Sequence, residues 1–121
     1  MADMNKGIVR TGGNGRRSAC VAYGGLVYVS GITTVDLAAD TAGQARDVMA
    51  QIEKLLLANG SHKNRLLSVN VTLRDMADYG HFNAVWDEWV VDAYEPARNV
   101  TGGELALPEY RIKISGIAAQ L

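Results

Sequence analysis

Two segments of this chain carry apolar residues at helical spacing, and the segments around them alternate between apolar and polar residues. The first helical stripe consists of Ala45, Val48, Met49, Ile52, Leu55 and Leu56. The second consists of Phe82, Val85, Trp86, Trp89, Val90 and Ala93. A helix with one apolar stripe buries one face, and an alternating strand does the same. The pattern therefore predicts a two-layer α+β sandwich in which two helices cover one face of a single sheet.

The first helix is predicted at 42–58, because both of its ends carry recognisable signals. Thr41 and Gln44 have the spacing of a capping box. Asn59 and Gly60 form a typical helix stop.

The remaining elements are predicted from alternation and turn residues. Asp78 is placed to cap the second helix, and Pro96 is placed to close it. The pair Gly24-Gly25 favours a tight hairpin. In chain order, the extended segments are expected at 18–23, 26–30, 67–73, 99–107 and 110–115, which gives the order β, β, α, β, α, β, β.

A length of 121 residues suits one domain over 1–121, with 1–15 as a loosely ordered N-terminal segment. The chain is too short for a third layer, so the second sheet face must be polar, closed on itself or buried in an oligomer. We expect the oligomer, because apolar strand residues are assigned to that face: Val21, Val27, Val29 and Ile117.

Composition excludes several classes of function. Twelve basic and thirteen acidic residues give a net charge of -1, which argues against a nucleic-acid partner. The single cysteine, Cys20, excludes an internal disulfide and indicates a reducing compartment. No signal-like or membrane-length apolar run occurs, so we expect a cytoplasmic protein without a membrane partner. His62 and His81 lack metal-site spacing, and no metal site is expected.

Arg98 is the side chain best placed for recognition of a small ligand. It follows Pro96 at the predicted end of a helix and the entry to a strand. An arginine at such a rigid junction can present its planar fork to a carboxylate or phosphate. The alternative is an ordinary exposed arginine.

The chain resembles the RidA (YjgF) reactive-intermediate deaminases, also described as L-PSP endoribonuclease-like proteins, from about residue 16 onward. The segments that carry the resemblance are Val27-Tyr28-Val29-Ser30-Gly31, Arg74-Asp75-Met76-Ala77-Asp78-Tyr79, Phe82-Asn83-Ala84-Val85, Pro96-Ala97-Arg98 and Leu107-Pro108 with Ile112-Lys113-Ile114-Ser115-Gly116-Ile117-Ala118.

The resemblance implies a chorismate-mutase-like fold with one mixed sheet. It also implies a homotrimer whose sheets form an inner barrel, with ligand pockets between subunits. Its implied activity is hydrolysis of the C–N bond of an enamine or imine. The arginine at position 98 would grip the substrate carboxylate, water would release ammonia and a 2-keto acid, and no cofactor would take part.

Carried over by position, the resemblance assigns carboxylate binding to Arg98, the pocket strand to Ser30 and Gly31, and a helix amide to Asn83. Three positions depart from the family pattern. Arg17 replaces a tyrosine, Val100 replaces a cysteine, and Lys113 replaces the glutamate credited with positioning or activating the hydrolytic water.

The change at position 113 opens alternatives. Lys113 is a catalytic base only if its pKa is depressed, because a protonated lysine accepts no proton. Otherwise Arg17, Arg98 and Lys113 form a pocket for a small keto- or imino-acid-like metabolite with two negative groups. A non-catalytic, ligand-binding or chaperone-like trimer is the other hypothesis. A one-residue slip in the last strand would exchange Lys113 with Ile112 or Ile114.

Overall fold

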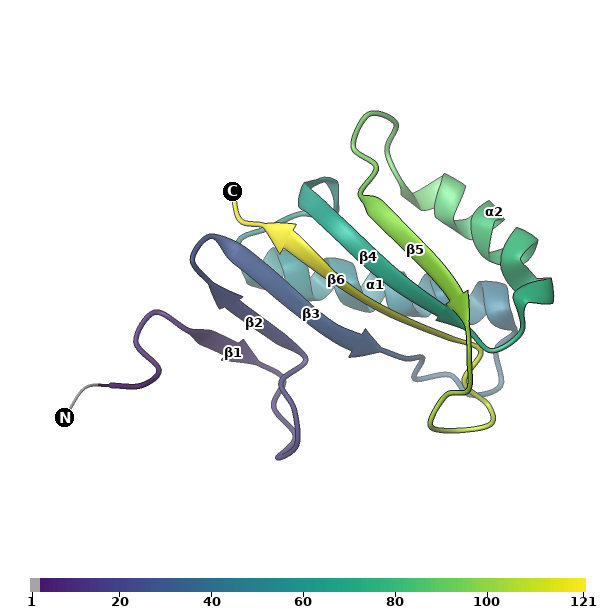
Figure 1. Cartoon of the computed structure of the whole chain (residues 1–121), viewed down its shortest axis with the longest axis horizontal. Coiled ribbons are helices and arrows are strands. Elements are labelled where there is room, and N and C mark those ends of the chain that lie inside the picture. Colours follow the sequence, from purple (N-terminus) through teal and green to yellow (C-terminus); the bar gives the residue numbers. More distant parts are fainter. Residues whose placement is uncertain (1–2) are drawn as a thin grey trace.

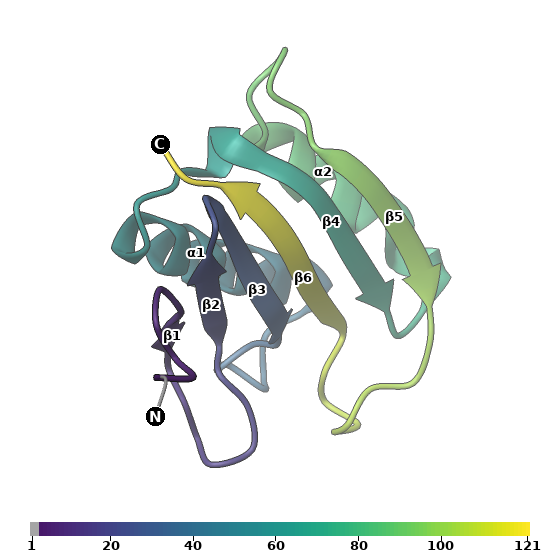
Figure 2. The ribbon, with the colours of Figure 1, turned by 60° about the vertical axis from the view of Figure 1, so that its left-hand side comes forward.

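The computed structural model (Figure 1) describes residues 3–121, and its architecture is the predicted α+β sandwich: one mixed sheet with two helices on one face. Figure 2 shows both helices behind the sheet. The strands are β1 Val9–Thr11, β2 Cys20–Tyr23, β3 Leu26–Ile32, β4 Leu66–Leu73, β5 Ala97–Gly102 and β6 Ile112–Ala119. The helices are α1 Thr41–Ala58 and α2 Tyr79–Trp89, with short 3-10 turns η1 Lys63–Arg65 and η2 Met76–Asp78.

The strand order explains why both helices share a face. The sheet runs β1-β2-β3-β6-β4-β5, and only the β4–β5 pair is parallel. Because β3 and β4 are both antiparallel to β6, α1 connects two parallel strands, as α2 connects β4 to β5. Successive crossovers of the usual right hand that advance in one direction place their helices on the same face.

The apolar core lies between the sheet and the helices. Val27 and Val29, expected on the uncovered face, are instead buried against the helices at 0% and 4% exposure. That part of the prediction was wrong. In β3, Val27 and Val29 face the helices, and Tyr28 between them faces the uncovered side. Val21 and Ile117 lie on the uncovered face, in one cross-strand row with Tyr28.

Two irregularities interrupt the sheet register. The β4–β6 register shifts between Leu66 and Ser68, so Leu66 and Val69, three residues apart, are both buried. The β3–β6 register shifts between Val29 and Ile32, which is a β-bulge at residues 30–31.

Helix α1 begins one residue earlier than predicted, and its cap is different. Asp40 is the N-cap, and its carboxylate accepts a hydrogen bond from the Gly43 amide at 2.8 Å. Gln44 does not complete a capping box with Thr41. It is fully buried, donates to the Glu109 carbonyl at 2.9 Å, and accepts from the Arg111 amide at 2.8 Å, which ties α1 to the segment entering β6.

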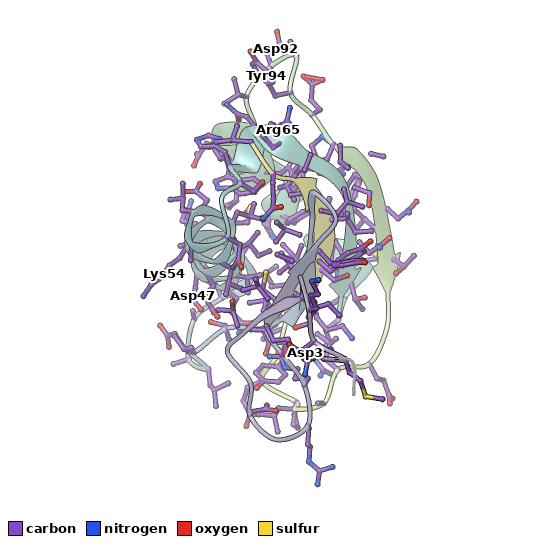
Figure 3. All side chains as sticks on the ribbon, turned by 90° about the vertical axis from the view of Figure 1, so that its left-hand side faces the viewer. Asp3, Asp47, Lys54, Arg65, Asp92 and Tyr94 are labelled. Carbon is purple, nitrogen blue, oxygen red and sulfur yellow. The ribbon has the colours of Figure 1, made fainter. Side chains whose placement is uncertain are left out.

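Helix α2 ends earlier than predicted. Trp89 is its last residue, and Val90 already has extended backbone. Ala93, assigned to the apolar stripe, lies in the following loop with φ of 74°. Pro96 therefore does not close the helix. The loop that it belongs to extends beyond the sheet, with Asp92 and Tyr94 at its tip (Figure 3).

Part of the N-terminal segment is more ordered than expected, and residues 1–2 of it lie outside the described residues. Strand β1 pairs with β2, so Val9–Thr11 belongs to the sheet although 1–15 was predicted to be loose. Three residues are too few to show the alternation that predicts a strand. The predicted hairpin is confirmed, because Gly24 and Gly25 both have positive φ, at 61° and 82°.

The N-termini of the two helices meet at a polar cluster. Thr41 donates a hydrogen bond to Asp78 at 2.7 Å, and His81 lies 3.4 Å from the other oxygen of the same carboxylate. The Thr41 hydrogen bond is the main cause that lowers the pKa of Asp78, with further contributions from His81 and Arg111. These residues line a cavity of about 260 Å³.

Candidate functional site

Arg98 points from the edge strand β5 toward α2. It pairs with the buried Val69 in the parallel register, which places its side chain on the helix-covered face. Its Nη1 donates to Asn83 Oδ1 at 3.0 Å, and its Nη2 donates to the Tyr79 hydroxyl at 3.2 Å. Residues 79 and 83 are one helical turn apart, so one face of α2 orients the guanidinium.

Aromatic rings complete the surroundings of Arg98. Its guanidinium carbon lies 5.1 Å from the Trp86 ring centroid, 5.5 Å from Phe82 and 6.0 Å from Tyr79. Cations are attracted to ring faces at these distances. The half-buried arginine is therefore held in place by hydrogen bonds and ring contacts, and the hydrogen-bonding groups that remain free can receive a planar anion.

Val100 lies two residues beyond Arg98 on the same sheet face. It is partly buried and packs against the hydrophobic core. In the single chain its apolar side chain therefore belongs to the packing of the core and makes no polar contact.

The other predicted site residues form a second cluster, at the bulge in β3. Arg17 Nη1 donates to Ser30 Oγ and, at 2.9 Å, to the Gly31 carbonyl oxygen. The Lys113 side chain crosses directly over Gly31, where an added Cβ would lie 2.8 Å from Lys113 Cδ. Arg17, Ser30, Gly31 and Lys113 are called the bulge cluster below.

The single chain does not bring Arg98 into the bulge cluster. Lys113 pairs with Thr72, whereas its neighbours Ile112 and Ile114 are buried at 0% and 1% exposure on the helix side. Lys113 therefore faces away from the helices, and Arg98 faces toward them. The expected convergence of three cations on one cleft does not occur within one protomer.

Sequence reasoning did not assign Tyr79 and Trp86 to the site. Trp86 was interpreted as core packing, which is correct, since it is 6% exposed, but its ring also faces Arg98. The available signal was helical spacing, because positions 79, 82, 83 and 86 share one face of α2.

The residues outside these clusters offer less chemistry. Cys20 is fully buried, and burial raises its pKa, as expected for an apolar packing residue. Within residues 3–121, no three His, Cys, Asp or Glu side chains are grouped as a metal ion would require. In the same part of the chain, no helix has the length and apolar character needed to cross a membrane.

Comparison with known proteins places this geometry in context. The profile of the family described as Endoribonuclease L-PSP matches residues 10–120. A RutC family protein from Haemophilus ducreyi is 34% identical, with 93% of this chain and 96% of the relative covered. A protein called 3-aminoacrylate deaminase RutC, from Acinetobacter baylyi, is 32% identical over 77% of this chain and 78% of its own length.

A solved structure supports the same relationship. The crystal structure of a YjgF family member from Neisseria meningitidis has a TM-score of 0.90 and 38% sequence identity. The alignment covers 94% of this chain and 95% of that one.

Proposed function

Because the chain belongs to the RidA (YjgF) family described as Endoribonuclease L-PSP and has its chorismate-mutase-like fold, we propose that it binds a small carboxylate-bearing metabolite through Arg98 and hydrolyses the C–N bond of an enamine or imine. As part of this proposal, residues 1–121 act as one domain.

The orientation of Arg98 is the observation that carries the proposal. Asn83 and Tyr79 each accept one of its hydrogen bonds, and the aromatic rings limit its movement. A guanidinium has five N–H donors, so donors remain for a carboxylate. Because α2 fixes the fork before a ligand arrives, less conformational entropy is lost on binding.

The chemistry follows from the substrate class. The relative called 3-aminoacrylate deaminase bears a name that describes a carboxylate attached to an enamine. Such an enamine takes up a proton at carbon to become an imine, water adds to the C=N carbon, and the C–N bond breaks with release of ammonia and a carbonyl product. Arg98 would hold the carboxylate so that the reacting carbon has one position throughout.

We place the complete site between protomers. Arg98 is half-buried at the sheet edge, while the bulge cluster lies on the uncovered face of the same chain. A homotrimer that packs its uncovered faces inward would bring Arg98 of one protomer toward the bulge cluster of its neighbour. This arrangement also buries Tyr28, which is 44% exposed in the single chain.

Lys113 favours a second candidate, a binding protein without turnover. Position 113 would carry a glutamate in the deaminases that the sequence resembles, and a protonated lysine does not activate water. The same fold and the same arginine would then retain an anionic metabolite, or support a chaperone-like role, without hydrolysing it.

The test uses freshly generated 2-aminoacrylate and measures ammonia release by the wild type, Arg98→Ala and Arg46→Ala. Arg46 is the matched control, because it is exposed on α1 and lines a cavity that includes none of the predicted site residues. We expect accelerated release that falls at least about 100-fold in Arg98→Ala, as for loss of a charged, oriented contact, and that persists in Arg46→Ala.

Two other outcomes are informative. Saturable binding of 2-oxobutanoate that requires Arg98, without ammonia release from 2-aminoacrylate, would support the binding protein. Equal behaviour of Arg98→Ala and the wild type in both assays would contradict both candidates.

A further inference from the structure

We propose that the bulge cluster is a second anion-binding subsite, which makes the protein selective for keto or imino acids that carry two carboxylates. This inference rests on the proposed function for the first carboxylate, which Arg98 holds. The subsite itself is argued from four residues of one chain, Arg17, Ser30, Gly31 and Lys113.

The bulge creates the surface for this subsite. Val29 pairs with Gly116, and Ile32 pairs with Ile114, so Ser30 and Gly31 together lie opposite the single residue Ser115. A bulge of this kind interrupts the regular ladder and redirects nearby side chains. It leaves a glycine at the point where the Lys113 side chain crosses.

Lys113 is fixed on this surface by its neighbours in sequence. Ile112 and Ile114 are buried in the core, so a slip of β6 by one residue would expose two isoleucines and bury the ammonium. A Cβ added to residue 31 would lie 2.8 Å from Lys113 Cδ, which is too close for two carbon atoms. The absence of a side chain on Gly31 thus lets the lysine lie flat across the bulge.

Arg17 approaches the same bulge from the loop before β2. Asn14 Oδ1 accepts hydrogen bonds from the Arg16 and Arg17 amides, at 3.0 and 2.9 Å, which shapes that loop. Only Nη1 of the Arg17 side chain is used within the described residues, on Ser30 and Gly31. The remaining donors of the guanidinium are available to a ligand.

Within residues 3–121, no ion pair involves Arg17 or Lys113 of the bulge cluster. The ion pairs there join Lys63 to Glu53 and His81 to Asp78. The nearest strand partners of this face are neutral, with Thr72 opposite Lys113 and Asn70 opposite Ser115. Two like charges beside one bulge repel each other, and an anion bound between them relieves the repulsion.

A ligand with two carboxylates fits the placement of the cations on the two sheet faces. Within one protomer, Arg98 and the bulge cluster are separated by the sheet. A single ligand therefore contacts both only where Arg98 of one protomer meets the bulge cluster of another. A monocarboxylate would use Arg98 alone, and a dicarboxylate would use both.

The experiment measures the binding of 2-oxobutanoate and 2-oxoglutarate by titration calorimetry at low salt. We expect 2-oxoglutarate to bind the wild type at least about tenfold more tightly, which is the scale of one charge-assisted hydrogen bond. Lys113→Gln and Arg17→Gln should each remove most of this preference by weakening the binding of 2-oxoglutarate. Lys113→Arg should retain the preference.

Lys54→Gln is the matched control and should leave both affinities unchanged, because Lys54 is exposed on α1 and points away from the sheet (Figure 3). Thermal melting of every variant verifies folding, and Arg17→Gln keeps the assignment testable if Lys113→Gln fails to fold.

The failures are distinguishable. Equal affinities in the wild type, with 2-oxobutanoate binding still lost in Arg98→Gln, would overturn the second subsite and keep the proposed function. A dicarboxylate preference that depends on Arg17 and Lys113 but not on Arg98 would keep the subsite and overturn the proposed function. Binding of neither compound would overturn the subsite. A preference for 2-oxoglutarate that is the same in the wild type, Arg17→Gln and Lys113→Gln would overturn it as well.

Discussion

At the scale of single residues, Asn83 decides how Arg98 is presented. Its side-chain oxygen accepts a hydrogen bond from Nη1 at 3.0 Å, while the Tyr79 hydroxyl accepts from Nη2. An amide is suited to this task because it is neutral and leaves the charge of the guanidinium free for a ligand. A carboxylate at position 83 would neutralise that charge.

We expect Asn83→Ala to weaken 2-oxobutanoate binding by about three- to tenfold, because one hydrogen bond to a charged group is lost and the arginine becomes more mobile. Titration calorimetry measures the change. Asn99→Ala is the control, because Asn99 follows Arg98 but bonds to Asn70 on the other sheet face. Equal weakening by both substitutions would count against the orienting role.

At the scale of secondary-structure elements, Asp78 connects the starts of the two helices. Its pKa is lowered in the folded protein below the ordinary value of 3.8, chiefly by the Thr41 hydrogen bond. A lowered carboxyl pKa stabilises the fold above the ordinary value, and this contribution disappears as the pH falls through the folded value.

Asp78→Asn should therefore lower the melting temperature at pH 7 by a few degrees. The difference from the wild type should narrow as the pH falls from about 4 through the lower pKa of the folded protein, where the wild-type carboxylate takes up its proton. Thermal melts at about five pH values between about 2.5 and 7 measure both effects. A difference that stays constant with pH would show that Asp78 acts without its charge.

Gln44 connects α1 to the segment that leads into β6. Gln44→Met keeps the approximate shape but leaves the Glu109 carbonyl and the Arg111 amide without their partner. We expect a loss of about 1–3 kcal/mol in the free energy of unfolding, measured by urea denaturation. Lys54→Met on the exposed face of α1 should change it by less than about 0.5 kcal/mol, and similar losses in both variants would contradict this role.

Sequence patterns predicted the elements well where the signals were local. The Asn59-Gly60 stop of α1 and the Gly24-Gly25 hairpin are confirmed, since each signal requires only a few adjacent residues. The end of α2 was wrong, because Val90 and Ala93 continue the apolar spacing beyond the point where the helix stops. Strand β1 was missed because three residues are too few to show an alternating pattern.

The site was predictable only in part, because its contacts join residues of different elements. Arg98 was identified from its position after Pro96, and Asn83 from a resemblance, yet their contact depends on the crossover that lays α2 over β5. The side on which Lys113 lies depends on the strand register. The alternation of Ile112 and Ile114 in the sequence does not fix this register, whereas the burial of both isoleucines in the core does.

At the scale of the whole molecule, the uncovered sheet face carries the row Val21, Tyr28 and Ile117. If homotrimerisation buries this row, a glutamate there would be costly to bury. Ile117→Glu should therefore lower the mass measured by light scattering from about three times the 13.0 kDa of one chain toward the mass of a single chain. Lys54→Glu, on the outer helix, should leave the mass unchanged. A monomeric wild type would contradict the proposed placement of the site between protomers.

The central claim is that Arg98 holds the carboxylate of a small metabolite. The most direct measurement is a crystal structure of the wild-type protein with 2-oxobutanoate. We predict both carboxylate oxygens within hydrogen-bonding distance of the Arg98 guanidinium, with Asn83 still accepting from Nη1. A carboxylate bound away from Arg98, or no bound ligand at saturating concentration, would contradict the claim.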